Sequence, residues 1–82
     1  MEFERVYEVT GRDYANAGRA STSVKDILKN LGVHPAVVRR AAIASYEAEM
    51  NVVIHASTGT LWARVDASNR PSFRMFSRTR SQ

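Results

Sequence analysis

Three polar side chains recur at four-residue intervals in the segment SYEAEMNVVIHAS, residues 45–57: Glu47, Asn51 and His55. Residues four apart lie on one face of an α-helix, almost above one another. A carboxylate can deprotonate a water or hydroxyl, an amide oxygen can coordinate Mg²⁺, and an imidazole can hydrogen-bond a phosphate. The combination suits phosphoryl transfer from a metal-bound nucleotide. The alternative is that the three side chains form the solvated stripe of an amphipathic helix.

Two segments alternate with the period of a β-strand. Residues 2–10, EFERVYEVT, place aromatic and branched side chains on one side, and residues 60–66, TLWARVD, repeat the pattern. The residues between these two segments have helical spacing. The order strand, helix, helix, strand predicts an α+β two-layer sandwich, in which the helices cover one face of a sheet.

The limits of the two helices follow from turn and cap residues. Asp13 is suited to cap the first helix and Gly32 to end it, although Gly18 leaves open whether its first turns are a loop. Pro35 suits the first turn of the second helix, and no Gly or Pro follows before Gly59. The second helix is apolar on several sides, so we expect it to be covered on most of them.

The positive charge is confined to the end of the chain. Residues 1–66 hold eight Lys and Arg and eight Asp and Glu, which cancel, whereas residues 67–82 hold four Arg and no acid, giving the net charge of +4. We therefore expect one domain over residues 1–66 and an atypical Arg- and Ser-rich tail over 67–82. The tail is either an edge strand or a disordered end.

Several classes of protein do not fit this composition. The chain has no cysteine, which excludes disulfides and thiolate metal sites and agrees with a reducing compartment. It has no apolar run approaching the roughly 20 residues of a membrane span, and its start lacks the pattern of a signal peptide. We expect a soluble cytoplasmic protein without a membrane partner.

The segment YEAEMNVVIHA, residues 46–56, resembles the N-box of the GHKL ATPase superfamily, which includes gyrase, a heat-shock chaperone, histidine kinases and MutL. Glu-x-x-x-Asn followed four residues later by His is typical of the anti-sigma-factor serine kinases within it. The lead-in ILKNLGVHPAVVRRAAIASYEAEMN and the order of elements also resemble the start of that family's domain. The resemblance covers about residues 3–66 and implies the N-terminal half of a Bergerat-type, histidine kinase-like ATP-binding domain.

The resemblance implies a role for each residue of the stripe. Asn51 would bind Mg²⁺ through its side-chain oxygen, Glu47 would be the general base that prepares the attacking hydroxyl or water, and His55 would lie beside the nucleotide phosphates. The ligands would be ATP and Mg²⁺, the activity would be that of a serine protein kinase, and the partner would be a sigma factor or an anti-sigma antagonist.

Two later motifs of the family do not occur in this sequence. These are the Asp-x-Gly-x-Gly turn that reads adenine and the Gly-rich lid over the phosphates; the last Asp is Asp66 and the last Gly is Gly59. We therefore expect a truncated or degenerate regulatory protein that is inactive as a kinase alone. An α/β half would also leave surfaces uncovered, so we expect a homo-oligomer formed by strand pairing or exchange of elements.

Two other functions remain open. Residues 24–42 resemble a helix-turn-helix, which would place Arg39 and Arg40 near DNA while the basic tail adds nonspecific affinity. The length of the second helix and the acids Glu47 and Glu49 oppose this interpretation, so nucleic acid is the less favoured partner. The third possibility is a protein-interaction module that binds no small ligand.

Overall fold

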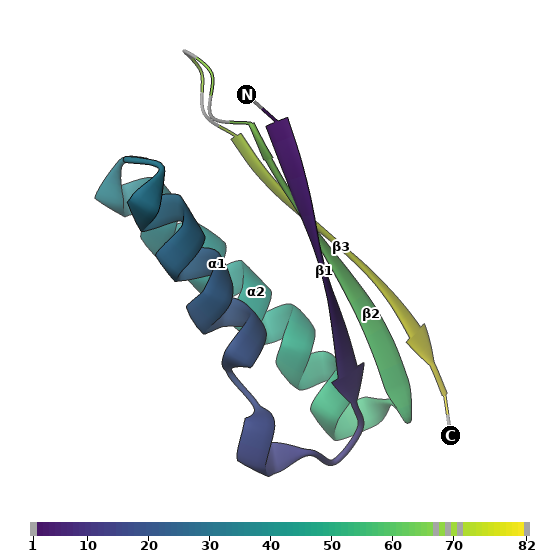
Figure 1. The fold of residues 1–82 in the computed structure, drawn as a ribbon. Coiled ribbons are helices and arrows are strands. Elements are labelled where there is room, and N and C mark those ends of the chain that lie inside the picture. Colours follow the sequence, from purple (N-terminus) through teal and green to yellow (C-terminus); the bar gives the residue numbers. More distant parts are fainter. Residues whose placement is uncertain (1, 67, 69, 71, 82) are drawn as a thin grey trace.

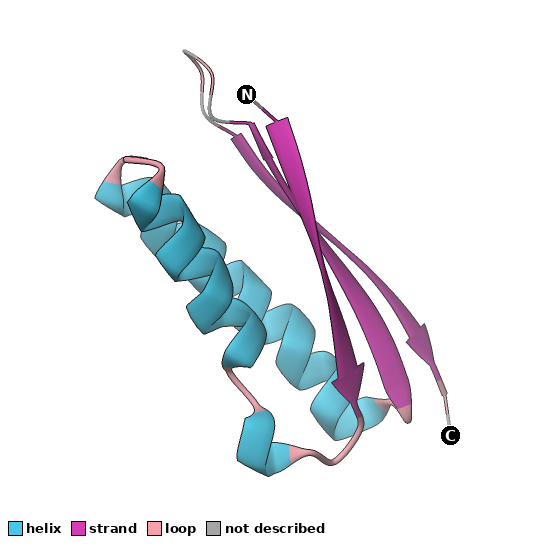
Figure 2. Ribbon diagram, viewed as in Figure 1, coloured by secondary structure: helices cyan, strands magenta, loops and turns pink. Residues whose placement is uncertain are grey.

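The computed structural model describes residues 2–66, 68, 70 and 72–81. The elements in chain order are β1 (Glu2–Thr10), a short 3-10 helix η1 (Tyr14–Asn16), α1 (Arg19–Asn30), α2 (Pro35–His55), β2 (Thr58–Asp66) and β3 (Ser72–Arg80) (Figure 1). The strands form one antiparallel sheet in the order β1-β2-β3, and both helices lie on the same face of it (Figure 2). The protein therefore has a small α+β fold with a helical layer and a three-stranded sheet.

The strand register runs over the full length of both pairs. β1 pairs with β2 from Glu2 opposite Asp66 to Thr10 opposite Thr58, and β2 pairs with β3 over nine residues. β2 thus begins two residues before the predicted start at residue 60. Residues 72–80 of the basic tail form an edge strand, while 67, 69, 71 and 82 lie outside the described residues.

Local backbone chemistry explains where each helix begins. The first helix starts at Arg19 rather than next to Asp13, because Gly18 has a φ of +100° that breaks the helical path. η1 fills the gap before it. At the start of α2, the Nδ1 atom of His34 accepts the Ala36 N–H at 3.0 Å, and Pro35 occupies the first turn.

The hydrophobic core lies between the helices and the inner face of the sheet. β2 contributes alternate residues to it, and each helix contributes residues three or four apart, as the two periodicities predict. Its most buried large side chains are Val24, Leu28, Val52, Val53 and Leu61.

α2 is covered on one side only, contrary to the expectation that its apolar surface needs cover on most sides. Ile43, Tyr46 and Ile54 are each about half exposed. The sheet and α1 meet the opposite side of the helix, and no further layer lies over α2 among the described residues (Figure 1). No helix in the described part of the chain is long and apolar enough to cross a membrane.

Candidate functional site

The structure brings the three predicted site residues onto one accessible side of α2. Glu47, Asn51 and His55 are all exposed and occupy successive turns of the same helix. None of the three side chains takes part in a hydrogen bond or ion pair with another described residue. Their carboxylate, amide and imidazole groups are therefore free to meet a ligand from solvent, although nothing in the fold holds them in a fixed orientation.

The oxygen atoms of this side could form only part of a metal site. Within the described ranges there is no group of three or more His, Cys, Asp or Glu side chains that could hold a metal ion. Mg²⁺ requires near-octahedral oxygen coordination and commonly retains several waters or phosphate oxygens. Asn51 could supply one oxygen, so a Mg²⁺ ion here would take most of its remaining ligands from water and a bound nucleotide.

The opposite side of α2 also contains polar groups, and these are buried. Ser45 satisfies its hydroxyl by donating to the Ala41 carbonyl at 2.7 Å. Glu49 is 3% exposed, and its Oε2 atom accepts the Ala20 N–H at a long 3.4 Å. Its Oε1 atom has no hydrogen-bond partner among the described residues. A buried carboxylate with one unmatched oxygen is costly unless its surroundings compensate the charge.

The start of α1 explains why the carboxylate of Glu49 is tolerated there. The first N–H groups of a helix have no partner within the helix and carry partial positive charge. Gly18, the residue before α1, supplies no side-chain cap, so Glu49 reaches across from α2 to the Ala20 N–H. Sequence reasoning assigned no role to Glu49. Its spacing from Ser45 and Val52, four and three residues, is the signal that places it on the buried side.

A cavity of about 310 Å³ lies beside Glu49 at the junction of β1, η1 and α1. Asp13 and Asn16 line it and bind each other, with the amide nitrogen donating to the carboxylate at 2.8 Å. Arg19 and Glu49 line the same space without forming an ion pair. None of the three predicted site residues contributes to this lining.

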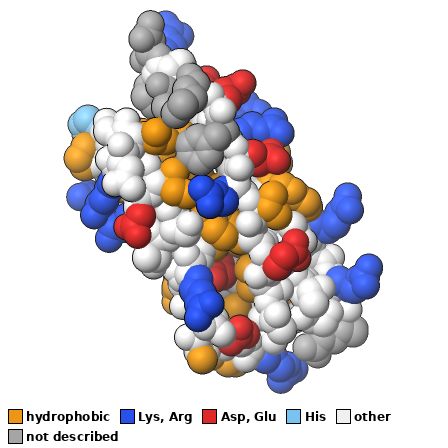
Figure 3. Space-filling view, viewed as in Figure 1, with side chains coloured by type: hydrophobic (Ala, Val, Ile, Leu, Met, Phe, Trp, Pro, Cys, Tyr) orange, Lys and Arg blue, Asp and Glu red, His pale blue; other side chains and the backbone are white. Residues whose placement is uncertain are grey.

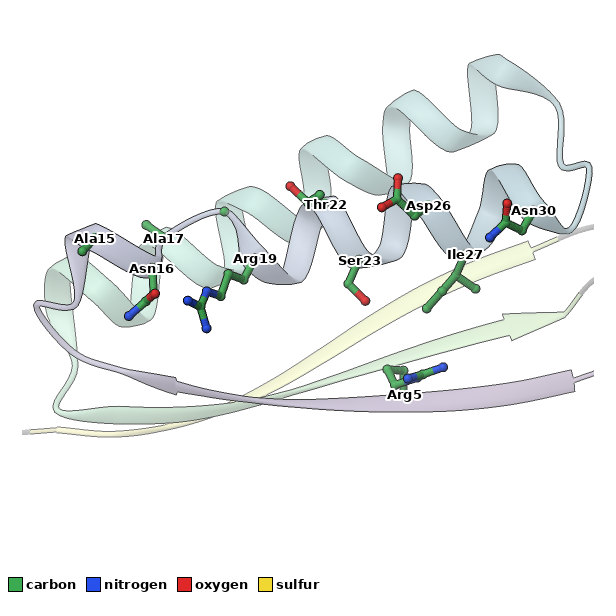
Figure 4. Close-up of a pocket in the computed structure, with 11 residues that line it drawn as sticks. Arg5, Ala15, Asn16, Ala17, Arg19, Thr22, Ser23, Asp26, Ile27 and Asn30 are labelled. Atoms are coloured by element: carbon green, nitrogen blue, oxygen red, sulfur yellow. The ribbon is translucent and has the colours of Figure 1, made fainter.

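A wider cavity of about 590 Å³ runs along α1 and the neighbouring part of β1. Arg5 on β1 and residues of α1, among them Arg19, Ser23 and Asp26, line it. Figure 4 shows Ser23 and Ile27 pointing from α1 towards the sheet, whereas Asp26 points away from it. The charges in this lining have both signs. Glu47, Asn51 and His55, the residues predicted to bind nucleotide, therefore lie on an exposed side of α2 and line neither cavity.

The helix pair differs from a helix-turn-helix in its arrangement. α2 is 21 residues long and lies alongside α1, running back in nearly the opposite direction (Figure 1). In a helix-turn-helix the two helices cross at about 90–120°. Arg39 and Arg40 are exposed, but the helix that carries them is packed lengthwise on the sheet.

Comparison with known proteins gives no match, so the assignment of the site rests on its own residues. No family model, curated protein or solved structure matches the chain. The resemblance of residues 46–56 to the N-box therefore stays a prediction from the sequence. What the structure provides is the exposure of Glu47, Asn51 and His55 on one side of α2 and the burial of Glu49 on the other.

Proposed function

We propose that this protein is a degenerate relative of the anti-sigma-factor serine kinases, a regulatory protein that retains the metal and base edge of a Mg-ATP site. The observation that carries the proposal is the joint exposure of Glu47, Asn51 and His55 on successive turns of α2. A side chain needed only for packing would be buried, as Ser45 and Glu49 are. The sequence resemblance of this segment supplies the identity of the ligand.

Each residue has a distinct role in the proposed site. The side-chain oxygen of Asn51 coordinates Mg²⁺, and the imidazole of His55 donates a hydrogen bond to a phosphate oxygen. The Glu47 carboxylate, one turn before Asn51, acts as the general base towards a hydroxyl or water. The Mg²⁺ ion neutralises the negative charge of the phosphates, because the protein itself does not enclose them.

The affinity for nucleotide is expected to be low. The chain lacks the Asp-x-Gly-x-Gly turn and the Gly-rich lid that would bind adenine and enclose the phosphates. Most of the surface of a bound nucleotide would remain in water, whereas ligand sites usually bury most of their ligand. We expect a dissociation constant of about a millimolar, equivalent to about −4 kcal/mol, and no turnover by the chain alone.

Exposed apolar side chains next to the polar stripe support a protein partner. Ile43, Tyr46 and Ile54 lie on the side of α2 that faces away from the core, and each is about half exposed. A partner that covered them would also cover the edge of the nucleotide site. The proposed partner is a sigma factor or an antagonist of an anti-sigma factor, with nucleotide bound at the shared boundary.

An NMR titration of the isotope-labelled full chain with ATP, in the presence and absence of Mg²⁺, tests nucleotide binding. We expect amide shifts centred on residues 47–55 that require Mg²⁺. Asn51→Ala should weaken binding by about tenfold, or about 1.4 kcal/mol. The matched control is Asn30→Ala, which makes the same change at an exposed position at the end of α1.

The same titration separates the competing functions. Shifts that are independent of Mg²⁺, or that are equally reduced in both asparagine variants, would contradict the proposed site. A parallel titration with duplex DNA at two salt concentrations examines the helix-turn-helix interpretation, which predicts binding that weakens steeply with salt. Absence of any response to nucleotide and DNA would leave a protein-interaction module.

A further inference from the structure

The sheet has one covered face and one open face. The helices pack against the face that contains Tyr7, Leu61 and Met75. The opposite face has no covering element among the described residues (Figure 1). Because side chains alternate along a strand, the open face presents every second residue of β1, β2 and β3.

The register aligns the open-face side chains in five rows across the strands, of which the outermost are Glu2, Asp66 and Ser72 at one end and Thr10, Thr58 and Arg80 at the other. The central row is Val6, Trp62 and Phe76, and rows two residues away on either side flank it. One flanking row is Glu4, Arg64 and Arg74, and the other is Glu8, Thr60 and Arg78. An apolar row therefore crosses the middle of the face between two polar rows.

The apolar row is accessible to solvent. Val6 is 48% exposed and Phe76 is 44% exposed, and Trp62 between them is partly exposed. The Arg64 guanidinium lies 5.7 Å from the centre of the Phe76 ring and covers part of it. A contiguous row of one branched and two aromatic side chains is the kind of surface that protein interfaces bury at their centre.

Charge is divided between the two edges of the same face. The open-face charges of β1 are the acids Glu2, Glu4 and Glu8, and those of β3 are the bases Arg74, Arg78 and Arg80. Figure 3 shows acidic side chains over β1 and basic side chains projecting on the β3 side of the molecule. The face therefore has acids on its β1 edge and bases on its β3 edge, and the apolar row crosses it from one edge to the other.

We propose that two copies of this protein associate through their open sheet faces, related by a two-fold axis parallel to the strands. Rotation about such an axis leaves each residue at the same height along the strands and reverses the order of the strands across the sheet. β1 of each copy therefore faces β3 of the other. Glu4 then faces Arg74, Glu8 faces Arg78, and the central apolar rows stack with Trp62 near the axis. Nothing in this proposal depends on nucleotide binding.

The other symmetric arrangement is disfavoured by charge. A two-fold axis that crossed the strands would place the acidic edge of one copy against the acidic edge of the other. With the axis along the strands, Asp66 and Arg64, both on β2, are the open-face charges that meet their own counterparts. Arg64 is already paired with Glu4 of its own chain at 3.0 Å and extends over the Phe76 ring.

Edge-to-edge pairing of β1 with β3 would also match the charges, but it leaves the central apolar row exposed. It is also a head-to-tail contact, which propagates without closing. Stacking of the two faces buries the row and closes at two copies. The face measures about 14 by 30 Å from standard strand spacings, which is small for a stable interface, so we expect micromolar or weaker affinity.

Sedimentation equilibrium of the full chain, combined with tryptophan emission over a dilution series, tests the proposal. Trp62 is the single tryptophan in the chain, so its emission reports directly on the centre of the interface. We expect a monomer–dimer equilibrium and a red shift of Trp62 on dilution. Phe76→Ser should weaken the dimer by about tenfold or more, whereas Tyr46→Ser, at an equally exposed aromatic on α2, should leave it unchanged.

A charge exchange identifies the orientation without depending on the apolar row. Glu8→Arg places like charges opposite each other in two symmetric contacts and should weaken the dimer by about tenfold. Adding Arg78→Glu should restore most of the affinity, with each variant's fold checked by circular dichroism. A monomer at millimolar concentration, a series of larger species unaffected by Phe76→Ser, or a double variant no tighter than Glu8→Arg would each overturn the proposal.

Discussion

Glu47 and Glu49 are separated by one residue in α2, yet their carboxylates occupy opposite environments. Glu47 is exposed and makes no hydrogen bond within the described residues, whereas Glu49 is 3% exposed and caps the start of α1. Two residues rotate an α-helix by about 200°, so these side chains point in nearly opposite directions. The same residue type therefore has two roles in one helix, and the role follows from the side on which it lies.

The difference between the two sides indicates which residues are available for binding. The buried side of α2 is committed to the contacts that hold the helix against α1 and the sheet. The exposed side contributes little to those contacts, so its polar and apolar residues can change without loss of the fold. A function that uses α2 must use the exposed side, and variants on the two sides should separate stability from binding.

The largest effect is expected when an aspartate replaces a buried residue of α2, in contrast to the same substitution at the neighbouring exposed residue. Val53 is fully buried and Ile54 is 48% exposed. Val53→Asp leaves an unpaired carboxylate in the core and should lower the free energy of unfolding by about 3–5 kcal/mol, enough to unfold so small a domain. Ile54→Asp should change it by about 0.5 kcal/mol. Urea denaturation of both variants measures the contrast, and similar losses would refute the assignment of the two sides.

A smaller effect is expected where α2 approaches β2. A Cβ atom at Gly59 would lie 3.0 Å from Cγ1 of Val52 and closer still to Cγ2. Gly59→Ala should therefore destabilise the protein by about 1–3 kcal/mol through overpacking. In the double variant with Val52→Ala, the loss should be less than the sum of the two single losses, because the smaller side chain makes room. If thermal denaturation gave additive losses of stability, the side chains at positions 52 and 59 would not be in steric conflict.

The smallest effect is expected from neutralising each glutamate of the opening comparison. Glu49→Gln keeps an oxygen that can accept the Ala20 N–H, but it replaces the unpartnered Oε1 atom with a buried amide group that has no acceptor, and it removes a carboxylate from the start of α1. It should therefore lower the free energy of unfolding by about 1 kcal/mol. Glu47→Gln, an identical change on the exposed side, should stay within about 0.5 kcal/mol. Urea denaturation under matched conditions measures both. A gain of stability in Glu49→Gln would mean that the start of α1 does not favour the carboxylate.

The sequence predicts the elements of this fold better than their environments. Period-two alternation locates β1, and Pro35 with the absence of later breakers gives the extent of α2, because both patterns reflect local geometry. The exposure of Ile43 and Tyr46 was not predictable, since periodicity shows that a residue is apolar but not whether another layer covers it. The environment of Glu49 depends on the start of α1, 29 residues earlier in the chain.

The sequence predicts which residues belong to the candidate site but not what surrounds them in the fold. The four-residue spacing of Glu47, Asn51 and His55 is enough to place them on one side of a helix. Whether that side forms the wall of a pocket depends on residues elsewhere in the chain. The sequence also left the tail undecided between a strand and a disordered end, because Arg-rich segments pair in a sheet only when a neighbouring strand offers a matching edge.

A backbone junction near His55 bears on how binding there could be communicated. The Gly11 N–H donates to the Ser57 carbonyl and the Arg12 N–H to the Val53 carbonyl, each at 2.7 Å. Both bonds join main-chain atoms, and the two segments lie close together, since a Cβ atom at Gly11 would collide with the Ala56 carbonyl oxygen. Any tilt of the last turn of α2 must therefore move the segment that leads into α1. A fluorophore attached to that segment would act as a remote sensor of events at His55.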